Sequence, residues 1–308
     1  MYRIGIDLGG TNIAVGVVDD GHAIVSRVSV PTMASRPAAE VVRDMGGAVE
    51  QALARAGASV ADCRSMGVGS PGTCNSAAGV VERAYNLGWD HVPVCRMLEE
   101  RFHVPCRLSN DANCAALAEQ VAGAAVGHDN VVLVTLGTGV GGGVIIDGKI
   151  YSGSNYAGAE LGHVVINMDG EICTCGRQGC WEAYASATAL IRQTKQAMIR
   201  YPKSKMWEIC GGDISKVSGR TSFDAMRAGD DTAKRVVDRY IEYVAIGISN
   251  NINIFQPDVL CVGGGISKEG STLIDPIVAY VEGENYARHI AKKTQIKAAA
   301  LGNDAGII

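Results

Sequence analysis

The stretch from Glu160 to Glu182 constrains this chain more than any other, because it gathers one histidine and three cysteines into a short span. These side chains are His163, Cys173, Cys175 and Cys180. Zinc is held tetrahedrally by thiolate sulfur and imidazole nitrogen, so a Cys3His set fills its four positions. Gly176 and Gly179 permit the tight backbone turns that such a site needs. We predict a closed, structural zinc site; the alternative is three buried free cysteines beside a surface histidine.

A carboxylate stands at each end of this stretch, Glu160 at one end and Glu182 at the other. Neither is expected to bind the metal, because the cysteines and the histidine already complete a tetrahedral set. Held beside a rigid metal site, the two acids would contribute to a polar pocket.

Composition narrows the class of protein. With 308 residues, the chain is long enough for two medium domains or one large one. A formal net charge of −4 gives no reason to expect nucleic acid or an anionic membrane as a partner. We find no signal-peptide pattern and no apolar run long enough to span a bilayer. The remaining cysteines are scattered singly, which favours reduced, buried side chains in the cytoplasm over a disulfide framework.

Two glycine-rich turns follow expected strands in related ways. The strand at residues 2–8 leads into Asp7-Leu8-Gly9-Gly10-Thr11-Asn12. Backbone N–H groups and the Thr11 hydroxyl could hold phosphate there, with Asp7 placed to hold Mg²⁺; an ordinary hairpin is the alternative. The second turn is Gly137-Thr138-Gly139. The segment around it has the same order of strand, glycine turn, strand and acidic turn as the segment around the first turn. This repeat indicates two halves of similar design, with a cleft between them.

The second turn also spells G-x-G-x-x-G through Gly137, Gly139 and Gly142. The dinucleotide-binding fingerprint requires a helix directly after the loop. Residues 144–148 read instead as strand and turn, so a Rossmann site is not expected.

Asn110 and Asp111 follow an expected strand at residues 104–108 and open a helix. Open α/β sheets place ligand chemistry at the carboxyl ends of their strands, which makes Asp111 a candidate catalytic group. Asn and Asp are also preferred N-cap residues, so a purely structural cap is the alternative.

Two further turns suit ligand binding. Gly264 and Gly265 follow a strand at residues 258–262 and offer free N–H groups to a nucleoside. The turn Ser70-Pro71-Gly72-Thr73 suits the edge of a cleft.

Hydrophobic periodicity predicts the regular elements. We expect helices at residues 38–57, 93–102, 111–122, 183–200, 230–255 and 275–288. We expect strands at residues 2–8, 13–19, 23–30, 65–69, 104–108, 130–136, 144–147, 258–262 and 295–299. Residues 201–220 are expected to be irregular and mobile.

The full set of motifs closely resembles the ROK family of sugar kinases, repressors and uncharacterised reading frames, and most of all its glucokinase branch. The motifs are Asp7–Asn12, Asn110-Asp111, Gly137–Gly143, Glu160–His163, Cys173–Glu182 and Val262–Gly265, and the resemblance covers nearly the whole chain. It implies the duplicated actin-like ATPase fold, which is α/β and ribonuclease H-like, with two domains around a central cleft. The small domain would hold residues 1–109 and those from about 298, and the large domain residues 110–297 with the zinc motif.

The resemblance also implies an activity, the ATP-dependent phosphorylation of a hexose, most of all glucose, at its 6-hydroxyl, with Asp111 as general base. The sugar would contact Asn110, Asp111, Glu160, His163, Glu182 and Gly72. ATP would contact Asp7, Gly9, Gly10, Thr11, Asn12, Thr138, Gly139, Gly264 and Gly265, with Mg²⁺ near Asp7. Zinc would be structural, held by His163, Cys173, Cys175 and Cys180.

Several alternatives stay open at this point. N-acetylmannosamine, other amino sugars, allose and fructose are alternative acceptors within the family. A non-catalytic sugar-sensing regulator and a zinc-stabilised interaction module are alternatives from other classes. The family's repressors carry a helix-turn-helix before the first strand, which here begins at residue 2, so we expect no nucleic-acid partner. Family members usually continue past Ile308, and the resemblance suggests a homodimer with the long helix from Asp230 as a contact.

Overall fold

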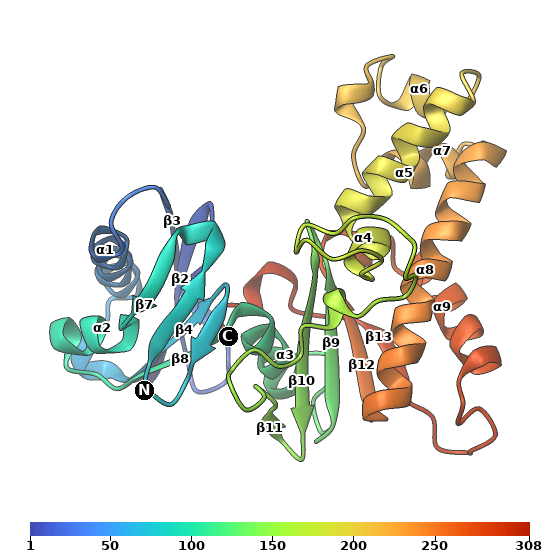
Figure 1. Ribbon diagram of the computed structural model, residues 1–308. Helices are drawn as coiled ribbons and strands as arrows, with labels where there is room; N and C mark the ends of the chain where they lie inside the picture. The colour runs from blue at the N-terminus through green and yellow to red at the C-terminus, as the bar shows by residue number, and fades with distance from the viewer. The chain divides into compact units, whose positions relative to one another are not determined.

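The structure is a computed structural model that describes residues 1–308 and divides them into two compact units (Figure 1). Unit 1 comprises Met1–Asp129, Gly143–Ala159 and Leu301–Ile308, and unit 2 comprises Asn130–Gly142 and Glu160–Ala300.

The first sheet has the strand order β3-β2-β1-β4-β8. Its strands are β1 (Tyr2–Leu8), β2 (Asn12–Val18), β3 (Ile24–Pro31), β4 (Cys63–Ser70) and β8 (Cys106–Asn110). β1 pairs antiparallel with β2 and parallel with β4, and β4 pairs parallel with β8. The strands form because β-branched residues recur in them, and Ile4, Ile6 and Leu8 of β1 are fully buried.

Helices cover this sheet on both sides. Figure 1 shows α1 (Ala38–Ala56) and α2 (Val94–Phe102) on one side and α3 (Asp111–Ala122) on the other. α1 ends as predicted at Gly57, which takes a left-handed conformation with φ of 64°. α3 packs on β4 and β8, so it belongs to unit 1, whereas the expected domain boundary at residues 109 and 110 would have separated it from those strands.

The second sheet repeats the topology of the first. Its order is β11-β10-β9-β12-β13. The strands are β9 (Val131–Leu136), β10 (Val140–Ile146), β11 (Lys149–Ile150), β12 (Val259–Gly263) and β13 (Gln295–Ala298). When the strands of each sheet are numbered by their order in the chain, both sheets have the same spatial order: third, second, first, fourth and fifth. The internal repeat that the two glycine turns indicated is therefore confirmed, and the fold is the duplicated actin-like ATPase fold.

One small sheet was not predicted from the sequence. It contains β5 (Thr73–Asn75), β6 (Val80–Ala84) and β7 (Trp89–Val92), all antiparallel. These strands are short and lie among turn residues, so they carry too little alternation to be recognised.

Unit 2 adds helices to strands β9, β12 and β13. They are α4 (Glu182–Ala185), α5 (Ala187–Arg200), α6 (Met206–Ile209), α7 (Thr221–Arg227), α8 (Asp231–Phe255) and α9 (Ser271–Glu284). The long α8 contacts α4, α5, α7 and α9 (Figure 1). Asp230 caps α8 by accepting hydrogen bonds from Thr232 N at 2.7 Å and Ala233 N at 3.0 Å.

The prediction of one helix at residues 183–200 is wrong, because Ser186 divides it. Ser186 has extended φ and ψ of −71° and 161°, and its hydroxyl accepts a hydrogen bond from Ala189 N at 3.1 Å. A serine in that conformation is an N-cap, so α5 starts anew after α4. The helix expected at residues 275–288 is also displaced, because α9 begins at Ser271 and ends at Glu284.

Residues 201–220 are more ordered than expected. They contain α6 and a 3-10 helix at Ile214–Lys216. Met206, Cys210 and Val217 are buried and pack in one cluster with apolar residues of α5 and α7. Short helical turns show too few repeats for their periodicity to be recognised, so only the packing reveals them. No helix of the structure has both the length and the apolar character needed to cross a membrane.

A glycine in α8 gives a test of this packing. A Cβ on Gly247 would overlap the indole of Trp181, which is fully buried and donates a hydrogen bond to Tyr243 O at 2.8 Å. We expect Gly247→Ala to lower the free energy of unfolding by about 1–3 kcal/mol, because the indole must shift. Gly283→Ala in α9 is the control: a Cβ there meets nothing within 4 Å, so stability should stay equal or rise. Equal effects in thermal unfolding would contradict the proposed close contact.

Candidate active site and metal centre

The carboxyl ends of three parallel strands form the polar corner of unit 1. Asp7 of β1 lies in register with Gly69 of β4, and Gly69 lies in register with Ser109 of β8. Asp111 follows two residues after Ser109 and begins α3. The sheet thus brings Asp7 and Asp111, which are far apart in sequence, to the same edge, as expected for an open α/β sheet.

The N-cap of α3 is Asn110. Its Oδ1 accepts hydrogen bonds from Ala112 N at 2.9 Å and Asn113 N at 3.4 Å, and its Nδ2 donates to Gly72 O at 3.2 Å. Asp111 is the first residue of the helix, and its Oδ1 accepts from Ala112 N at 2.9 Å. Because Asn110 already caps the helix, the alternative that Asp111 serves only as a cap does not hold.

The two carboxylates of this corner are perturbed by their surroundings. Surrounding protein raises the pKa of the Asp111 carboxyl by desolvation, although the residue is exposed at the surface. Hydrogen bonds from the Ala112 and Asp111 backbones and from Asn110 offset part of that rise. Burial also raises the pKa of Asp7; the charge of Asp111 raises it further, and Arg27 lowers it. A carboxylate with a raised pKa accepts a proton more readily than an ordinary one, which suits a general base.

Two thiols lie near these acids and were not singled out by the sequence. Burial first, and the charge of Asp111 second, raise the pKa of Cys74 and of Cys114 to about 12. Both thiols therefore stay neutral at physiological pH. All seven cysteines outside the predicted metal site are free; Cys114 is partly exposed, and the other six are buried, as predicted.

The first glycine turn is a tight hairpin at this corner. Gly9 N donates to Asn12 O at 2.9 Å, and Thr32 Oγ1 donates to Gly9 O at 2.6 Å. Gly10, Thr11 and Asn12 are exposed at its tip. Hydrogen bonds at Gly9 therefore fix the base of the turn, while its exposed tip is accessible to a ligand.

Gly306 was missed by the sequence analysis. A Cβ at this position would come within 2.6 Å of Asp7 Oδ2, so only glycine fits against that carboxylate. The neighbouring Ile307 is buried against Gly5 and Gly16. In the sequence, Gly306 is a lone glycine with no surrounding motif. The sequence alone does not distinguish such a glycine from one in an ordinary turn.

The second glycine turn, in unit 2, is tethered to α5. Ala187 N donates to Gly137 O at 2.8 Å, and Thr188 Oγ1 donates to Thr138 O at 2.7 Å. β10 follows the turn directly, which confirms that no Rossmann helix is present. Gly264, with φ of 84°, lies against Leu136 at the end of β9, so Thr138, Gly139, Gly264 and Gly265 share one edge of the second sheet.

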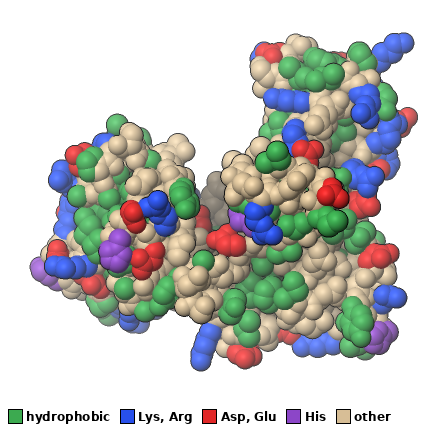
Figure 2. Space-filling model, viewed as in Figure 1, with side chains coloured by type: hydrophobic (Ala, Val, Ile, Leu, Met, Phe, Trp, Pro, Cys, Tyr) green, Lys and Arg blue, Asp and Glu red, His purple; other side chains and the backbone are tan.

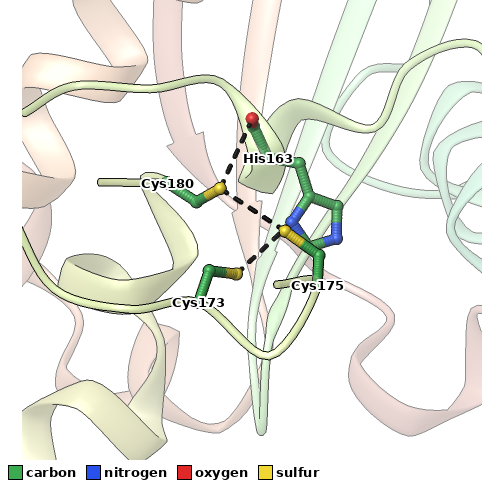
Figure 3. Close-up of side chains that lie close together, drawn as sticks. All are labelled: His163, Cys173, Cys175 and Cys180. Carbon is green, nitrogen blue, oxygen red and sulfur yellow. Dashed lines mark hydrogen bonds between the residues drawn. The ribbon is translucent and has the colours of Figure 1, made fainter. Parts of the chain in front are cut away.

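The predicted metal ligands converge in unit 2. Ligand atoms of His163, Cys173, Cys175 and Cys180 all lie within 4.8 Å of one another (Figure 3). Cys175 Sγ is 3.7 Å from Cys180 Sγ, and Cys173 Sγ is 3.6 Å from His163 Nδ1. In a tetrahedral zinc site, such pairs stand about 3.6–3.8 Å apart, so this donor set fits zinc.

The loop at residues 163–180, which carries these side chains and is called the metal loop here, turns at the predicted glycines. Gly176 and Gly179 have φ of 86° and 80°, which favour glycine. The chain around them is held by isolated β-bridges, Val165 with Cys180 and Ile172 with Gln178. These contacts hold the cysteines in place through the backbone.

Glu182 links the metal loop to the second glycine turn. Its Oε1 accepts from Thr174 Oγ1 and its Oε2 accepts from Val140 N, both at 3.0 Å. Glu160 precedes the 3-10 helix Leu161–His163, and its carbonyl accepts from His163 N at 3.1 Å. Both predicted acids and His163 thus lie with the metal loop in unit 2, whereas Asn110, Asp111 and Gly72 lie together in unit 1.

Comparison with known proteins identifies the family of this chain. A model of the ROK family matches residues 3–308. The glucokinase of Streptomyces coelicolor is 38% identical over 314 residues, which cover 99% of this chain and 95% of that protein. The structure of a ROK family glucokinase from Streptomyces griseus, in complex with glucose and AMPPNP, is 35% identical with a TM-score of 0.84, covering 100% of this chain and 97% of that one. The xylose repressor of Bacillus spizizenii is more distant: 27% identical over 307 residues, covering 99% of this chain and 74% of the repressor.

Fold, site and relatives together define an ATP-dependent sugar kinase. The chain belongs to the ROK family.

The raised pKa of Asp111 predicts a cost in stability. A carboxyl whose pKa is higher in the folded than in the unfolded chain destabilises the fold when ionised. We expect Asp111→Asn to melt at the same temperature as the wild type or higher at pH 7, in buffer without magnesium. The advantage of the variant should vanish as pH falls below the unfolded pKa of about 3.9, where both states are protonated. A variant that melts clearly lower at pH 7 would show that the ionised carboxylate stabilises the fold.

Proposed function

We propose that this ATP-dependent sugar kinase phosphorylates glucose at its 6-hydroxyl, with Asp111 as the general base. The observation that carries the proposal is the state of Asp111, whose carboxylate is partly desolvated while Asn110 caps the helix. Asp111 would take the proton of the 6-hydroxyl as that oxygen attacks the γ-phosphorus of ATP, and the bond from that phosphorus to the bridging oxygen of ADP breaks. Phosphoryl transfer needs positioning and charge neutralisation more than covalent help from the protein.

The nucleotide would be held chiefly by backbone groups. In unit 1, the exposed hairpin tip Gly9–Asn12 presents N–H groups and the Thr11 hydroxyl to phosphate. In unit 2, Thr138 and Gly139 would do the same, while Gly264 and Gly265 would flank the nucleoside. Asp7 would hold Mg²⁺, which neutralises phosphate charge when bound.

Each unit supplies candidate sugar-binding side chains. In unit 1, Asn110 still has an N–H beyond the one it gives to Gly72, and Asp111 supplies the carboxylate. In unit 2, His163 directs Nδ1 toward Cys173, so its Nε2 can bind a sugar hydroxyl. Glu160 and Glu182 would accept hydrogen bonds from further hydroxyls. Gly72 would act through its backbone by fixing the Asn110 amide.

Zinc would be structural in this scheme. Its four ligands would be His163, Cys173, Cys175 and Cys180. The metal would fix the His163 ring and the loop that leads to Glu182, and so shape the sugar site from behind.

Two other functions compete with glucose kinase activity: phosphorylation of another sugar, and sugar sensing without catalysis. Another acceptor, such as N-acetylmannosamine, allose or fructose, would use the same base and the same phosphate turns. A sugar-sensing regulator is suggested by the repressor relatives, but it gives no role to a carboxylate with a raised pKa beside a phosphate-type turn. Glucose is favoured because relatives at 35–38% identity over almost the whole chain are glucokinases.

We further propose a cytoplasmic homodimer that binds neither nucleic acid nor a membrane. The ten cysteines are all free, which agrees with a reducing compartment. Ile254 near the end of α8 is 64% exposed and offers an apolar contact to a second copy.

An ADP-release assay with a panel of sugars tests the reaction. With ATP and magnesium, we expect glucose to give a higher kcat/KM than N-acetylmannosamine, allose or fructose. Asp111→Asn should lower kcat by about 10²–10⁴-fold, the usual contribution of a general base, while glucose still binds in calorimetry. Asp238→Asn, which removes an exposed acid on α8, is the control and should keep wild-type kcat. Undiminished turnover in Asp111→Asn would remove the base assignment, and a better rate with another sugar would change the substrate.

Metal analysis tests the zinc proposal. We expect the purified protein to contain about one zinc ion per chain. Cys180→Ser should lose that zinc and melt several degrees lower, because metal binding contributes to folding. Cys63→Ser is the matched control, since its side chain is also buried and can donate to Ser59 O as the thiol does at 3.6 Å. Zinc retained by Cys180→Ser, or absent from the wild type, would refute the site.

A further inference from the structure

A groove between α5 and α8 has no part in the proposed reaction. It has a volume of about 840 Å³ and lies wholly within unit 2. Four arginines line it, Arg192 and Arg200 from α5 and Arg235 and Arg239 from α8, and the only carboxylate among its lining residues is Glu171. Figure 2 shows Lys and Arg side chains gathered over these helices of unit 2. The groove therefore carries an excess of positive charge.

The arginines are incompletely paired within the protein. The exposed Arg200 side chain makes no hydrogen bond or ion pair. Arg192 donates from Nη2 to Ala183 O at 2.7 Å, but its buried Nε has no hydrogen-bond partner. Arg235 donates only to the Thr232 hydroxyl, at 3.0 Å. Only Arg239 has a close carboxylate, Glu242 at 2.7 Å, since Arg192 and Glu171 are 3.6 Å apart. Guanidinium donors left without carboxylates are available to an external anion.

Aromatic rings hold two of these guanidinium groups in place. Arg235 lies over the ring of Tyr201 at 5.3 Å, and Arg239 lies over the ring of Tyr243 at 5.8 Å. Tyr243 packs in turn against Tyr184, with ring centroids 4.8 Å apart. Stacked arginines lose less freedom on binding a ligand, and their planar donors match phosphate oxygens two at a time.

The spacing of the arginines sets the size of the anion. At 1.5 Å per residue, Arg192 and Arg200 are separated by about 12 Å along α5, and Arg235 and Arg239 by about 6 Å along α8. A single phosphate spans only part of that length. A small molecule with a phosphate group at each end would meet arginines along the whole groove.

We propose that this groove binds a small organic phosphate carrying two separated phosphate groups, of the class of sugar bisphosphates. A second copy of the chain fits less well, because a two-fold axis at the groove would bring its arginines against one another. Glu171 at one end lies on the metal loop, and its N–H donates to Tyr184 Oη at 2.7 Å. The groove therefore adjoins that loop but includes no residue of the glycine turns.

Calorimetry with fructose 1,6-bisphosphate as the probe tests the proposal. We expect saturable binding to the full-length protein, unchanged by saturating AMPPNP and weaker at higher salt. The double variant Arg235→Gln, Arg239→Gln should raise Kd at least about tenfold, because two charge-assisted contacts are lost. Arg220→Gln, Lys234→Gln removes two exposed positive charges of the same unit outside the groove, so its Kd should stay within about twofold. Both variants should keep the wild-type circular dichroism spectrum and the wild-type kcat.

Other outcomes would overturn the proposal. Absence of binding to the wild type would refute the proposal. An equal loss of affinity in both double variants would show only a general effect of charge. Competition by AMPPNP would place the probe on the phosphate turns. Unchanged binding by Arg235→Gln, Arg239→Gln, together with a change of oligomeric state in sedimentation, would identify the groove as an interface between copies.

Discussion

The capping of α3 by Asn110 is the interaction on which the proposed chemistry depends. A helix N-terminus has N–H groups without partners, and Asn110 Oδ1 accepts from two of them. Gly72 O holds the other end of the same amide. Asp111 is thereby relieved of the capping role but stays fixed at the start of the helix. Parallel pairing of β1, β4 and β8 then brings Asp7 to the same corner, where burial first, and the charge of Asp111 second, raise the pKa of Asp7.

Unit 2 uses one carboxylate to join two loops. Glu182 accepts from Thr174 on the metal loop and from Val140 directly after the glycine turn. The ligand atoms of His163, Cys173, Cys175 and Cys180 lie within 4.8 Å of one another, and two of the pairs have the separations of a tetrahedral zinc site. A bound ion would fix the loop at the end nearest Glu182. Through this link, a metal remote from the phosphate turn would still influence its position.

The structure offers two different chemistries for phosphate. The glycine turns present backbone N–H groups, which can approach a phosphate closely because glycine has no side chain. The groove between α5 and α8 presents guanidinium groups held on tyrosine rings. The first suits a reacting group that must be positioned accurately, and the second suits a ligand that is only bound. This difference is why we separate the groove from the proposed reaction.

Local patterns in the sequence determined much of this protein. Cysteine and histidine spacing predicted the cluster of candidate metal ligands, alternating β-branched residues predicted β1 to β3, and the paired glycine turns indicated the repeated topology, because each is encoded within a short segment. Only the tertiary structure decided the rest. It showed that Asn110, and not Asp111, caps α3, that Ser186 divides a predicted helix, that α3 packs with unit 1, and that Gly306 lies against Asp7. It also assembled the arginine groove from helices more than thirty residues apart. Such features depend on contacts between distant segments, and composition, spacing and periodicity carry no direct record of those contacts.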